Sequence, residues 1–386
     1  MDLFSSVLFP ILIFIILLGP LMFVHELGHF IAAKRAGIRV EEFGMGFPPR
    51  ALTLFKRGET TYTLNWLPIG AFVKMTGEDG AAVVDPRSFG AQSKRWRLIV
   101  LLAGPVMNFL FAIPVLFLAY LLLYAQPVAT QYKITVSPGS NAEKIGMRSG
   151  DIVLAANGMD ATDYLLPKDT PATISKAELE RLRRAPATDS VLRQQASASI
   201  GKPFSVTVLR EENGIKRQLE VSGALPATAD SKVPLGVSLE AQLVRSARVA
   251  LTFGEAFDQM TFDVGRALGA MVTIPLDVLR GRLAPEIARP VGPIGITQIG
   301  VSLWQQGPFP FVQFAGLLSI LIGISNLLPI PALDGGRILF ILIEWIRGRR
   351  IDPVREQWIH AVGMIFVLAL AAVIALFDII RPIRLP

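Results

Sequence analysis

No cysteine occurs among the 386 residues of this chain. This absence excludes structural disulfides and every metal site that is built from thiolates. Charged residues are also scarce: they make up 18% of the chain, against about a quarter of an average soluble domain, whereas hydrophobic residues reach 52%. We find no internal repeat, no low-complexity tract and no basic face with interleaved aromatic residues, and the last absence argues against a nucleic-acid partner.

The hydrophobic residues are concentrated in four long runs. About 20 helical residues cross the hydrocarbon core of a bilayer, so each run is long enough to form a transmembrane helix. The first run is too long for a signal peptide, lacks a basic segment before it and has no small-residue cleavage site after it, so we expect it to remain in the protein. The four runs cover residues 7–33, 98–124, 309–346 and 359–380.

Clusters of basic residues follow the first run, precede the second and separate the third from the fourth. The positive-inside rule places such clusters in the cytoplasm, which puts both termini and residues 125–308 outside. Two arginines near the C-terminus oppose this assignment, but three clusters outweigh them. We therefore expect a multi-pass protein of a cell membrane such as the bacterial inner membrane. The clusters are Lys34, Arg35 and Arg39; Lys94, Arg95 and Arg97; and Arg347, Arg349 and Arg350.

The segment between the first two runs has strand character. Residues 60–66 are rich in β-branched and aromatic side chains and lie between two turn signals, so they are expected to form one arm of a β-hairpin, with the other arm at residues 51–55. A hairpin this apolar, beside a membrane helix, is expected in the membrane interface or as a re-entrant element. We assign residues 1–125 to an N-terminal membrane core that contains this hairpin.

Residues 126–241 are expected to form an extracytoplasmic β-rich domain. In the segment 136–153, Ser140 or Asn141 can cap a one-turn helix, and Gly150-Asp151 can start a new strand. Short strands with one or two helices predict a small module of about 100 residues. Residues 161–200 are polar and resemble an insertion into it.

The remainder of the chain returns to the membrane. Within residues 242–308 we expect a membrane-surface helix from about Arg248 to Arg282, followed by an extended, loop-like segment at residues 291–296. Residues 309–386 form a C-terminal membrane core. The predicted fold class is thus a polytopic α-helical membrane protein with about four transmembrane helices, a membrane-associated β-hairpin and an inserted β-rich domain.

The first run contains the motif His25-Glu26-Leu27-Gly28-His29. Histidines at positions i and i+4 lie above one another on one helix face, where both imidazoles can bind one metal ion. Glu26 then lies beside the metal and can accept a proton from water. An ionised group at the bilayer centre costs about 2.5–3.5 kcal/mol, so such residues are retained for function or for pairing. We favour the metal site over the alternative, in which the histidines bond to neighbouring helices and Glu26 is a buried neutral acid.

A hydrolytic zinc site needs three protein ligands and one open position, and the sequence offers few candidates for the third. His360 is the remaining histidine and is expected to be an interfacial polar residue. Glu344, Asp378 and Asp334 are acidic residues in apolar surroundings, and Glu344 is expected to lie near Arg347 at the cytoplasmic end. Asp334 stands out because prolines and glycines interrupt the third run around it, and broken helices at membrane depth line cavities. The alternative for Asp334 is a plain helix cap.

The interrupted segment runs from Asn326 to Gly336 and includes Pro329 and Pro331. Each proline lacks a backbone donor and leaves a carbonyl oxygen free, so an extended backbone here could pair with a substrate strand by β-addition. In the second run, Gly104 and Asn108 share one helix face at i and i+4. They either support close helix packing or place Asn108 beside the metal helix, where its amide orients a ligand or a substrate group.

Taken together, these motifs resemble the site-2 protease family of intramembrane zinc metalloproteases, closest to the bacterial branch with four spans and an external PDZ domain. The resemblance covers nearly the whole chain. It implies Zn²⁺ bound by His25, His29 and Asp334, with Glu26 activating a water molecule. It also implies that Asn326 binds the substrate or polarises its carbonyl group.

The segment 136–153 resembles the circularly permuted bacterial PDZ pattern, so residues 126–241 are expected to be one PDZ-like domain. No glycine-hydrophobic loop of the kind that binds a peptide carboxylate precedes residues 132–136. A size filter or a contact with the substrate or a regulator is therefore an equal alternative to capture of a C-terminal peptide.

The resemblance implies cleavage inside the transmembrane segment of a single-span protein, for example an anti-sigma-factor-like protein, after a first cut outside the membrane. This is the site-2 step of regulated intramembrane proteolysis, with the active site toward the cytoplasmic side of the bilayer. A helix hides its carbonyl groups, so the hairpin at residues 51–66 and the broken segment at 326–334 are expected to hold the substrate extended. Two alternatives remain: a metal transporter or sensor, which needs a polar path across several spans, and a membrane scaffold with an inert metal site.

Overall fold

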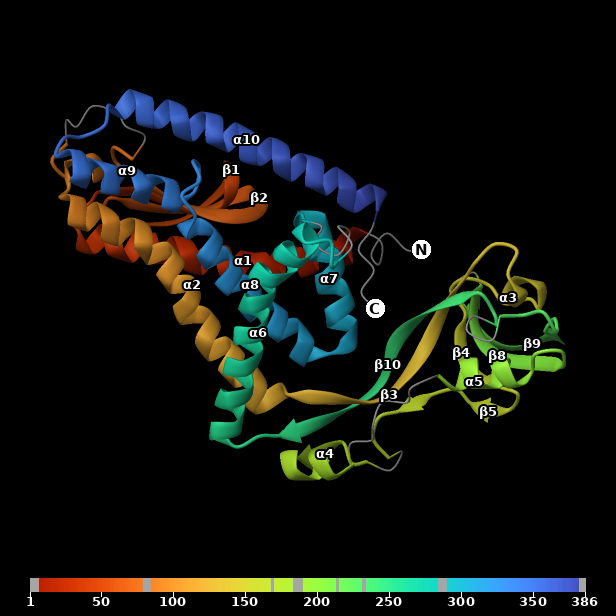
Figure 1. Cartoon of the computed structure of the whole chain (residues 1–386). Helices are drawn as coiled ribbons and strands as arrows, with labels where there is room; N and C mark the ends of the chain where they lie inside the picture. The colour runs from red at the N-terminus through yellow and green to blue at the C-terminus, as the bar shows by residue number, and fades with distance from the viewer. Residues whose placement is uncertain are drawn as a thin grey trace. The chain divides into compact units, whose positions relative to one another are not determined.

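A computed structural model describes residues 7–78, 85–167, 170–182, 190–212, 215–230, 234–283 and 290–381 of the chain. These residues form two compact units (Figure 1). One unit is Leu121–Ala256. The other joins the residues before this insertion, up to Tyr120, to those after it, from Phe257 onward.

Four helices of the described chain are long and apolar enough to cross a membrane, which confirms the expected number of spans. The third hydrophobic run, residues 309–346, is divided: α8 ends at Leu327, and a separate helix, α9, covers Asp334–Arg347. The division follows from Pro329 and Pro331, because each lacks the N–H group that an α-helix needs to continue. The four long helices are α1 (Phe9–Arg35), α2 (Lys94–Leu123), α8 (Pro308–Leu327) and α10 (Pro353–Ile380).

Helices α1 and α2 approach each other closely at Gly28. A Cβ atom at Gly28 would lie 2.2 Å from the carbonyl oxygen of Ala103, so only glycine permits this contact. Nearer the N-terminus of α1, the buried side chains Ile13, Leu17 and Leu21 pack against α8. Small residues allow helices to pack closely in a membrane, where the hydrophobic effect adds little.

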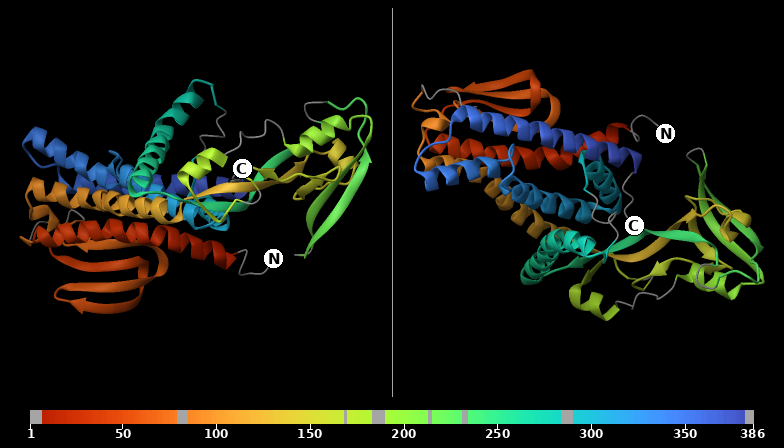
Figure 2. Two further views of the ribbon diagram at one scale, coloured as in Figure 1. Left: turned by 90° about the horizontal axis from the view of Figure 1, so that it is seen from below. Right: turned by 45° about the horizontal axis from the view of Figure 1, so that its top comes forward.

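A folded β-ribbon lies along α1 (Figure 2, left). Its two strands, β1 (Val40–Arg57) and β2 (Thr60–Met75), are longer than the predicted arms. The first part of β1 lies between two parts of β2, since Phe43 pairs with both Tyr62 and Val73. The segment 71–75 of β2 therefore forms one outer edge of the ribbon. A short 3-10 helix, η2 (Phe89–Ala91), follows.

The ribbon has an unusually apolar surface. Its exposed hydrophobic side chains would be costly in water, and they suit an element that contacts lipid. The most exposed of them are Leu52, Leu54, Phe55, Trp66 and Leu67.

The inserted unit is β-rich. Its main sheet has the order β7-β10-β3-β4-β8-β9, with β5 paired to β4 and β6 paired to β3. Ser140 caps α3 by accepting a hydrogen bond from the backbone N–H of Glu143, as the sequence predicted. The strands are β3 (Ala125–Val136), β4 (Ile152–Ala156), β5 (Met159–Asp160), β6 (Asp163–Tyr164), β7 (Thr173–Ser175), β8 (Pro203–Glu212), β9 (Ile215–Ala224) and β10 (Val237–Ala250); the helices are α3 (Asn141–Lys144), α4 (Lys176–Leu182) and α5 (Val191–Ala198).

Two expectations for residues 242–308 were wrong in detail. Strand β10 continues to Ala250, so the long helix α6 covers Phe253–Leu279 and begins later than Arg248. The segment 291–296 is not an extended loop, because α7 (Pro293–Gln306) begins within it. Pro293 occupies the first helical turn, where a missing N–H costs nothing.

The start of α7 is held by Asp378 on α10. Its Oδ2 accepts hydrogen bonds from the backbone N–H groups of Gly292 at 3.0 Å and Gly295 at 2.8 Å. The Gly-Pro signal is thus a helix start, stabilised by a carboxylate 83 residues away from Gly295 in the chain.

Candidate metal centre

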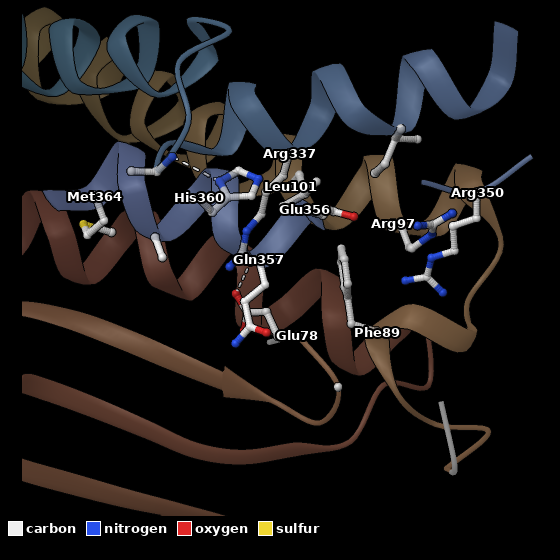
Figure 3. Close-up of a pocket in the computed structure, with 14 residues that line it drawn as sticks. Glu78, Phe89, Arg97, Leu101, Arg337, Arg350, Glu356, Gln357, His360 and Met364 are labelled. Carbon is white, nitrogen blue, oxygen red and sulfur yellow. Dashed lines mark hydrogen bonds and ion pairs between the residues drawn. The ribbon is translucent and has the colours of Figure 1, made fainter. Parts of the chain in front are cut away.

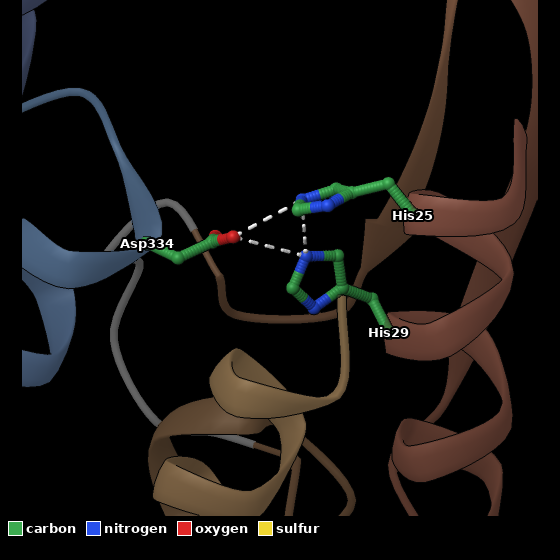
Figure 4. A group of neighbouring side chains, drawn as sticks. All are labelled: His25, His29 and Asp334. Atoms are coloured by element: carbon green, nitrogen blue, oxygen red, sulfur yellow. Dashed lines mark hydrogen bonds and ion pairs between the residues drawn. The ribbon is translucent and has the colours of Figure 1, made fainter. Parts of the chain in front are cut away.

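Three ligand atoms converge where α1 meets the start of α9 (Figure 4). The two histidines of the α1 motif are buried, and their Nε2 atoms lie 3.2 Å apart. Asp334, the first residue of α9, places Oδ2 3.1 Å from Nε2 of His25 and 3.3 Å from Nε2 of His29. Helical spacing brings the histidines together, and the break after α8 turns the carboxylate toward them.

The spacing of these atoms suits a zinc ion. Ligands at about 2.0–2.1 Å from a tetrahedral ion lie about 3.3–3.4 Å from one another. The three observed separations, 3.1, 3.2 and 3.3 Å, match three corners of such a tetrahedron and leave the fourth corner for water or substrate. In the described part of the chain, no other group of three His, Asp or Glu side chains could share a metal ion.

The other candidates for the third ligand have different partners. The Glu344 carboxylate accepts a hydrogen bond of 2.6 Å from Arg97, the Asp378 carboxylate holds the start of α7, and His360 contacts Ala332. The structure therefore brings only Asp334 to the histidine pair among these four residues.

The hydrogen bond of Nδ1 in His29 leaves the other ring nitrogen, Nε2, free to face the metal site. The Nδ1–H group donates to the carbonyl oxygen of Val100 on α2 at 2.8 Å. A neutral imidazole carries one proton, so this bond leaves a lone pair on Nε2 that points toward the other two ligand atoms.

His25 has a matching neighbour in Asn108, which is completely buried on α2. Nδ1 of His25 lies 3.2 Å from the side-chain amide, whose Nδ2 is the nearer atom, while Oδ1 has no partner among the described residues. The oxygen and nitrogen of an amide occupy nearly the same space and are assigned from their hydrogen bonds. Turning the amide by half a rotation lets Oδ1 accept from Nδ1–H, which satisfies the buried oxygen and frees Nε2 for a metal.

Gly104, one helical turn before Asn108, provides the space for the site. A Cβ atom at Gly104 would lie 2.3 Å from Nε2 of His29 and 2.8 Å from Nε2 of His25. The two residues of the Gly104/Asn108 face thus lie beside the histidine pair, as the second of the two sequence interpretations predicted.

A cavity of about 200 Å³ opens beside the three ligand atoms. Glu26 lines it, one residue after His25, and its carboxylate lies beside the backbone of Val73 on β2. Two residues along, the backbone N–H of Met75 donates to the carboxylate of Glu78 at 3.4 Å. Two carboxylates that line the cavity therefore lie at this edge of β2.

The predicted substrate-binding residues differ in whether they line this cavity. Asn326 lines the cavity, and its Nδ2 donates to the carbonyl oxygen of Ile322 at 3.0 Å. Pro329 and Pro331 lie in the turn between α8 and α9 but do not line the cavity, whereas Ala332 and Leu333 do.

The turn is compact rather than extended. Glycines at the start of α9 pack against its carbonyl groups: a Cβ atom at Gly335 would lie 2.1 Å from the oxygen of Leu328, and one at Gly336 would lie 2.4 Å from that of Ile330. The β2 segment 71–75, which sequence reasoning overlooked, offers an open strand edge to the cavity. The predicted arms at residues 51–66 do not line it.

A second cavity of about 280 Å³ adjoins the first (Figure 3). The two share four lining residues, among them Glu78 and Arg337, whose side chains form an ion pair. His360 from α10 and Arg97 from α2 also line the second cavity, and each has one buried nitrogen without a partner among the described residues. The sequence offered His360 only as a candidate third ligand, and no signal in it linked Arg337 to the metal centre.

The β-rich unit has a groove of its own, about 390 Å³ in volume. It lies between α5, through Leu192 and Arg193, and the start of β10, through Val237 and Leu239. The segment Pro234-Leu235-Gly236 also lines the groove.

Comparisons with known proteins match almost the whole chain. A family model described as peptidase family M50 matches residues 13–370. The zinc metalloprotease RasP of Geobacillus kaustophilus is 28% identical over 96% of this chain and 97% of its own length. The regulator of sigma-W protease RasP of Bacillus subtilis is 27% identical over 96% and 98%, and the chloroplastic membrane metalloprotease ARASP of Arabidopsis thaliana is 29% identical over 97% and 79%.

Proposed function

The chain belongs to peptidase family M50 and is a zinc metalloendopeptidase with several apolar helices of membrane-spanning length, and from this premise we propose that it cleaves peptide bonds within the transmembrane segments of single-span membrane proteins. In this proposal His25, His29 and Asp334 hold the zinc ion, and Glu26 activates the water. The observation that carries it is the convergence of Nε2, Nε2 and Oδ2 within 3.3 Å of one another, beside Glu26, in an apolar helix.

When bound, the zinc ion supplies Lewis acidity to the scissile carbonyl group and makes a water molecule more acidic. Glu26 accepts a proton from the attacking water and delivers it to the leaving amine nitrogen. The Nδ1 bonds of the two histidines, to Val100 and to Asn108, keep both rings oriented during this step. Asn326, on the cavity wall, is in place to donate to the substrate carbonyl group.

The open edge of β2 supports binding of an extended substrate. A transmembrane helix must unwind before cleavage, since its carbonyl and N–H groups are bonded to each other. A substrate strand at the edge 71–75 would find donors at Val73 and Met75, two residues apart and directed to the same side. Val73 lies beside Glu26, so a substrate carbonyl group that pairs with this N–H would lie next to the proposed catalytic carboxylate.

We propose that the metal centre lies toward the cytoplasmic side and the β-rich unit outside, and the basic clusters beside the apolar helices support this orientation. The groove between α5 and β10 supports a PDZ-like role for that unit, because an extended peptide can add to a free strand edge beside a helix. We propose that it contacts the substrate or a regulator. The name of the Bacillus subtilis relative, a regulator of sigma-W, makes an anti-sigma-factor-like membrane protein our candidate substrate.

The direct test uses the purified full-length chain with a single-span substrate, with and without a zinc chelator. We expect the wild-type protein to cleave only when zinc is present, and Glu26→Gln to retain zinc but to lose cleavage, because the ligands remain while the base is lost. Cleavage by Glu26→Gln at the wild-type rate would exclude the proposed role of Glu26. A metal transporter would instead move zinc across vesicles without proteolysis, and an inert scaffold would do neither.

A further inference from the structure

His360 joins α10 to the turn that presents Asp334. Its Nδ1 accepts a hydrogen bond of 3.1 Å from the backbone N–H of Ala332, two residues before Asp334 (Figure 3). The sequence had suggested only a polar residue at the membrane interface. A side chain on the fourth span instead bonds the backbone next to the third metal-ligand candidate.

This bond serves a backbone group that has no acceptor within its own turn. The N–H groups of Leu328, Ile330 and Leu333 bond to carbonyl oxygens of residues 325, 328 and 330, and the two prolines have none to offer. The N–H of Ala332 is the exception in the turn, and its acceptor comes from α10. A partly buried backbone donor left without an acceptor costs free energy, so the imidazole has a specific task here.

The backbone at Ala332 also needs support. Its φ is +83°, in the left-handed region that favours glycine and that residues with a Cβ atom rarely adopt. Such a conformation persists only when the surrounding contacts hold it. The hydrogen bond to His360 is a contact of this kind. The ring of Phe340 on α9 also packs edge-on against the imidazole, with the two ring centroids 5.4 Å apart.

Gly363 brings the backbone of α10 against the same turn. A Cβ atom at Gly363 would lie 2.4 Å from Cβ of Pro331 and 2.9 Å from its carbonyl carbon. Neighbouring α10 side chains such as Val362, Ile365 and Phe366 are exposed. His360 and Gly363 thus form the face of α10 that contacts the turn, while other faces of the helix are directed outward.

We propose that His360 is a positioning residue for the metal centre: by accepting the hydrogen bond from Ala332, it holds the turn in the conformation that directs Asp334 at His25 and His29. The inference rests on the proposed role of Asp334 as third ligand. Since Nδ1 is the acceptor, the imidazole proton is on Nε2, a buried atom without a partner among the described residues. The fourth span is thereby coupled to zinc affinity although it contributes no ligand.

The experiment measures zinc affinity of the purified full-length protein by competition with a chromophoric chelator, and the absorption spectrum of the Co²⁺-substituted protein. His360→Leu removes the acceptor, and we expect about 10–100-fold weaker zinc binding and an altered Co²⁺ spectrum, the effect of losing an outer-shell partner. His360→Asn places Oδ1 near the position of Nδ1 and should restore both to wild-type values. Val362→Ala, an exposed neighbour on α10, is the matched control and should change neither.

Wild-type zinc affinity in His360→Leu would overturn the proposal, as would an equal loss in His360→Leu and His360→Asn, which would indicate packing rather than hydrogen bonding. If His360→Leu does not fold, wild-type zinc affinity in Gly363→Ala, whose methyl group would displace Pro331, would overturn the proposal, because the metal centre would then not depend on the position of the turn. Asp334→Ala separates this inference from the proposed function. Unchanged zinc affinity in Asp334→Ala would show that Asp334 is not the third ligand. Weaker zinc binding in Asp334→Ala, together with wild-type affinity in His360→Leu, would refute only the positioning role of His360.

Discussion

Gly104 on α2 and His29 on α1 are so close that a Cβ atom on the glycine would lie 2.3 Å from Nε2 of the histidine. Nε2 of His29 is also the atom that faces the metal site, so the space beside Gly104 is part of that site. The contact explains why a glycine is needed one turn before Asn108, since any side chain would enter the position of the ligand atoms.

We expect Gly104→Ala to weaken zinc binding by more than about tenfold, because the methyl group must push the imidazoles out of tetrahedral spacing. Chelator competition on the purified protein measures this. Gly19→Ala on α1 is the control, since the nearest atom to its Cβ is 4.0 Å away. Equal zinc affinities for the two variants would show that the metal centre adapts to the added methyl group.

Asn108 should act as a hydrogen-bond acceptor toward His25. Asn108→Asp keeps an acceptor at Nδ1 and should retain zinc, whereas Asn108→Leu, of similar size, should lower zinc affinity by about 10–100-fold. The same competition assay distinguishes them. If Asn108→Asp lost zinc and Asn108→Leu kept it, the amide would be a donor and the proposed orientation of His25 would be incorrect.

The edge of β2 offers a test of substrate binding that leaves the metal ligands intact. Val73→Pro removes one outward N–H group, and we expect kcat/KM to fall by about tenfold, the value of one hydrogen bond, with unchanged zinc affinity. Val73→Ala keeps the N–H group and is the matched control. Cleavage by Val73→Pro at the rate of Val73→Ala would place the substrate elsewhere.

The β-rich unit depends on a buried ion pair between Asp151 and Arg210. Arg210 donates from Nε and from a terminal nitrogen to the two carboxylate oxygens, each at 2.7 Å, and the hydrogen bond to Asp151 raises the pKa of Arg210, so the guanidinium stays charged. Asp151→Ala should destabilise this unit by about 3–5 kcal/mol, because it leaves a buried charge unpaired.

Limited proteolysis of the full-length chain in urea would detect this loss as earlier cleavage within residues 121–256, with zinc affinity unaffected. Arg148→Ala is the control. It breaks the exposed pair with Glu212, which contributes about 0–1 kcal/mol. Equal protease resistance of the two variants would contradict a stabilising role for Asp151.

The sequence by itself determined the features that depend on local periodicity. Helical spacing places His25 and His29 on one face, apolar length defines the four spans, and prolines 329 and 331 interrupt the third run wherever the rest of the chain lies. Asp334, the proposed third ligand, was also suggested by its irregular setting. Such features are local because the backbone geometry of one segment is enough to produce them.

Only the tertiary structure decided which distant groups meet. Asp334 reaches His25 across 309 residues, Asn108 turns its amide to the same ring, and the β2 edge at Val73 reaches Glu26 although the predicted arms ended at residue 66. His360 looked like an interfacial residue because nothing in α10 itself indicates a partner. Its acceptor role exists because the N–H of Ala332 finds no acceptor within its own turn, and α10 reaches this turn only when the helices pack together.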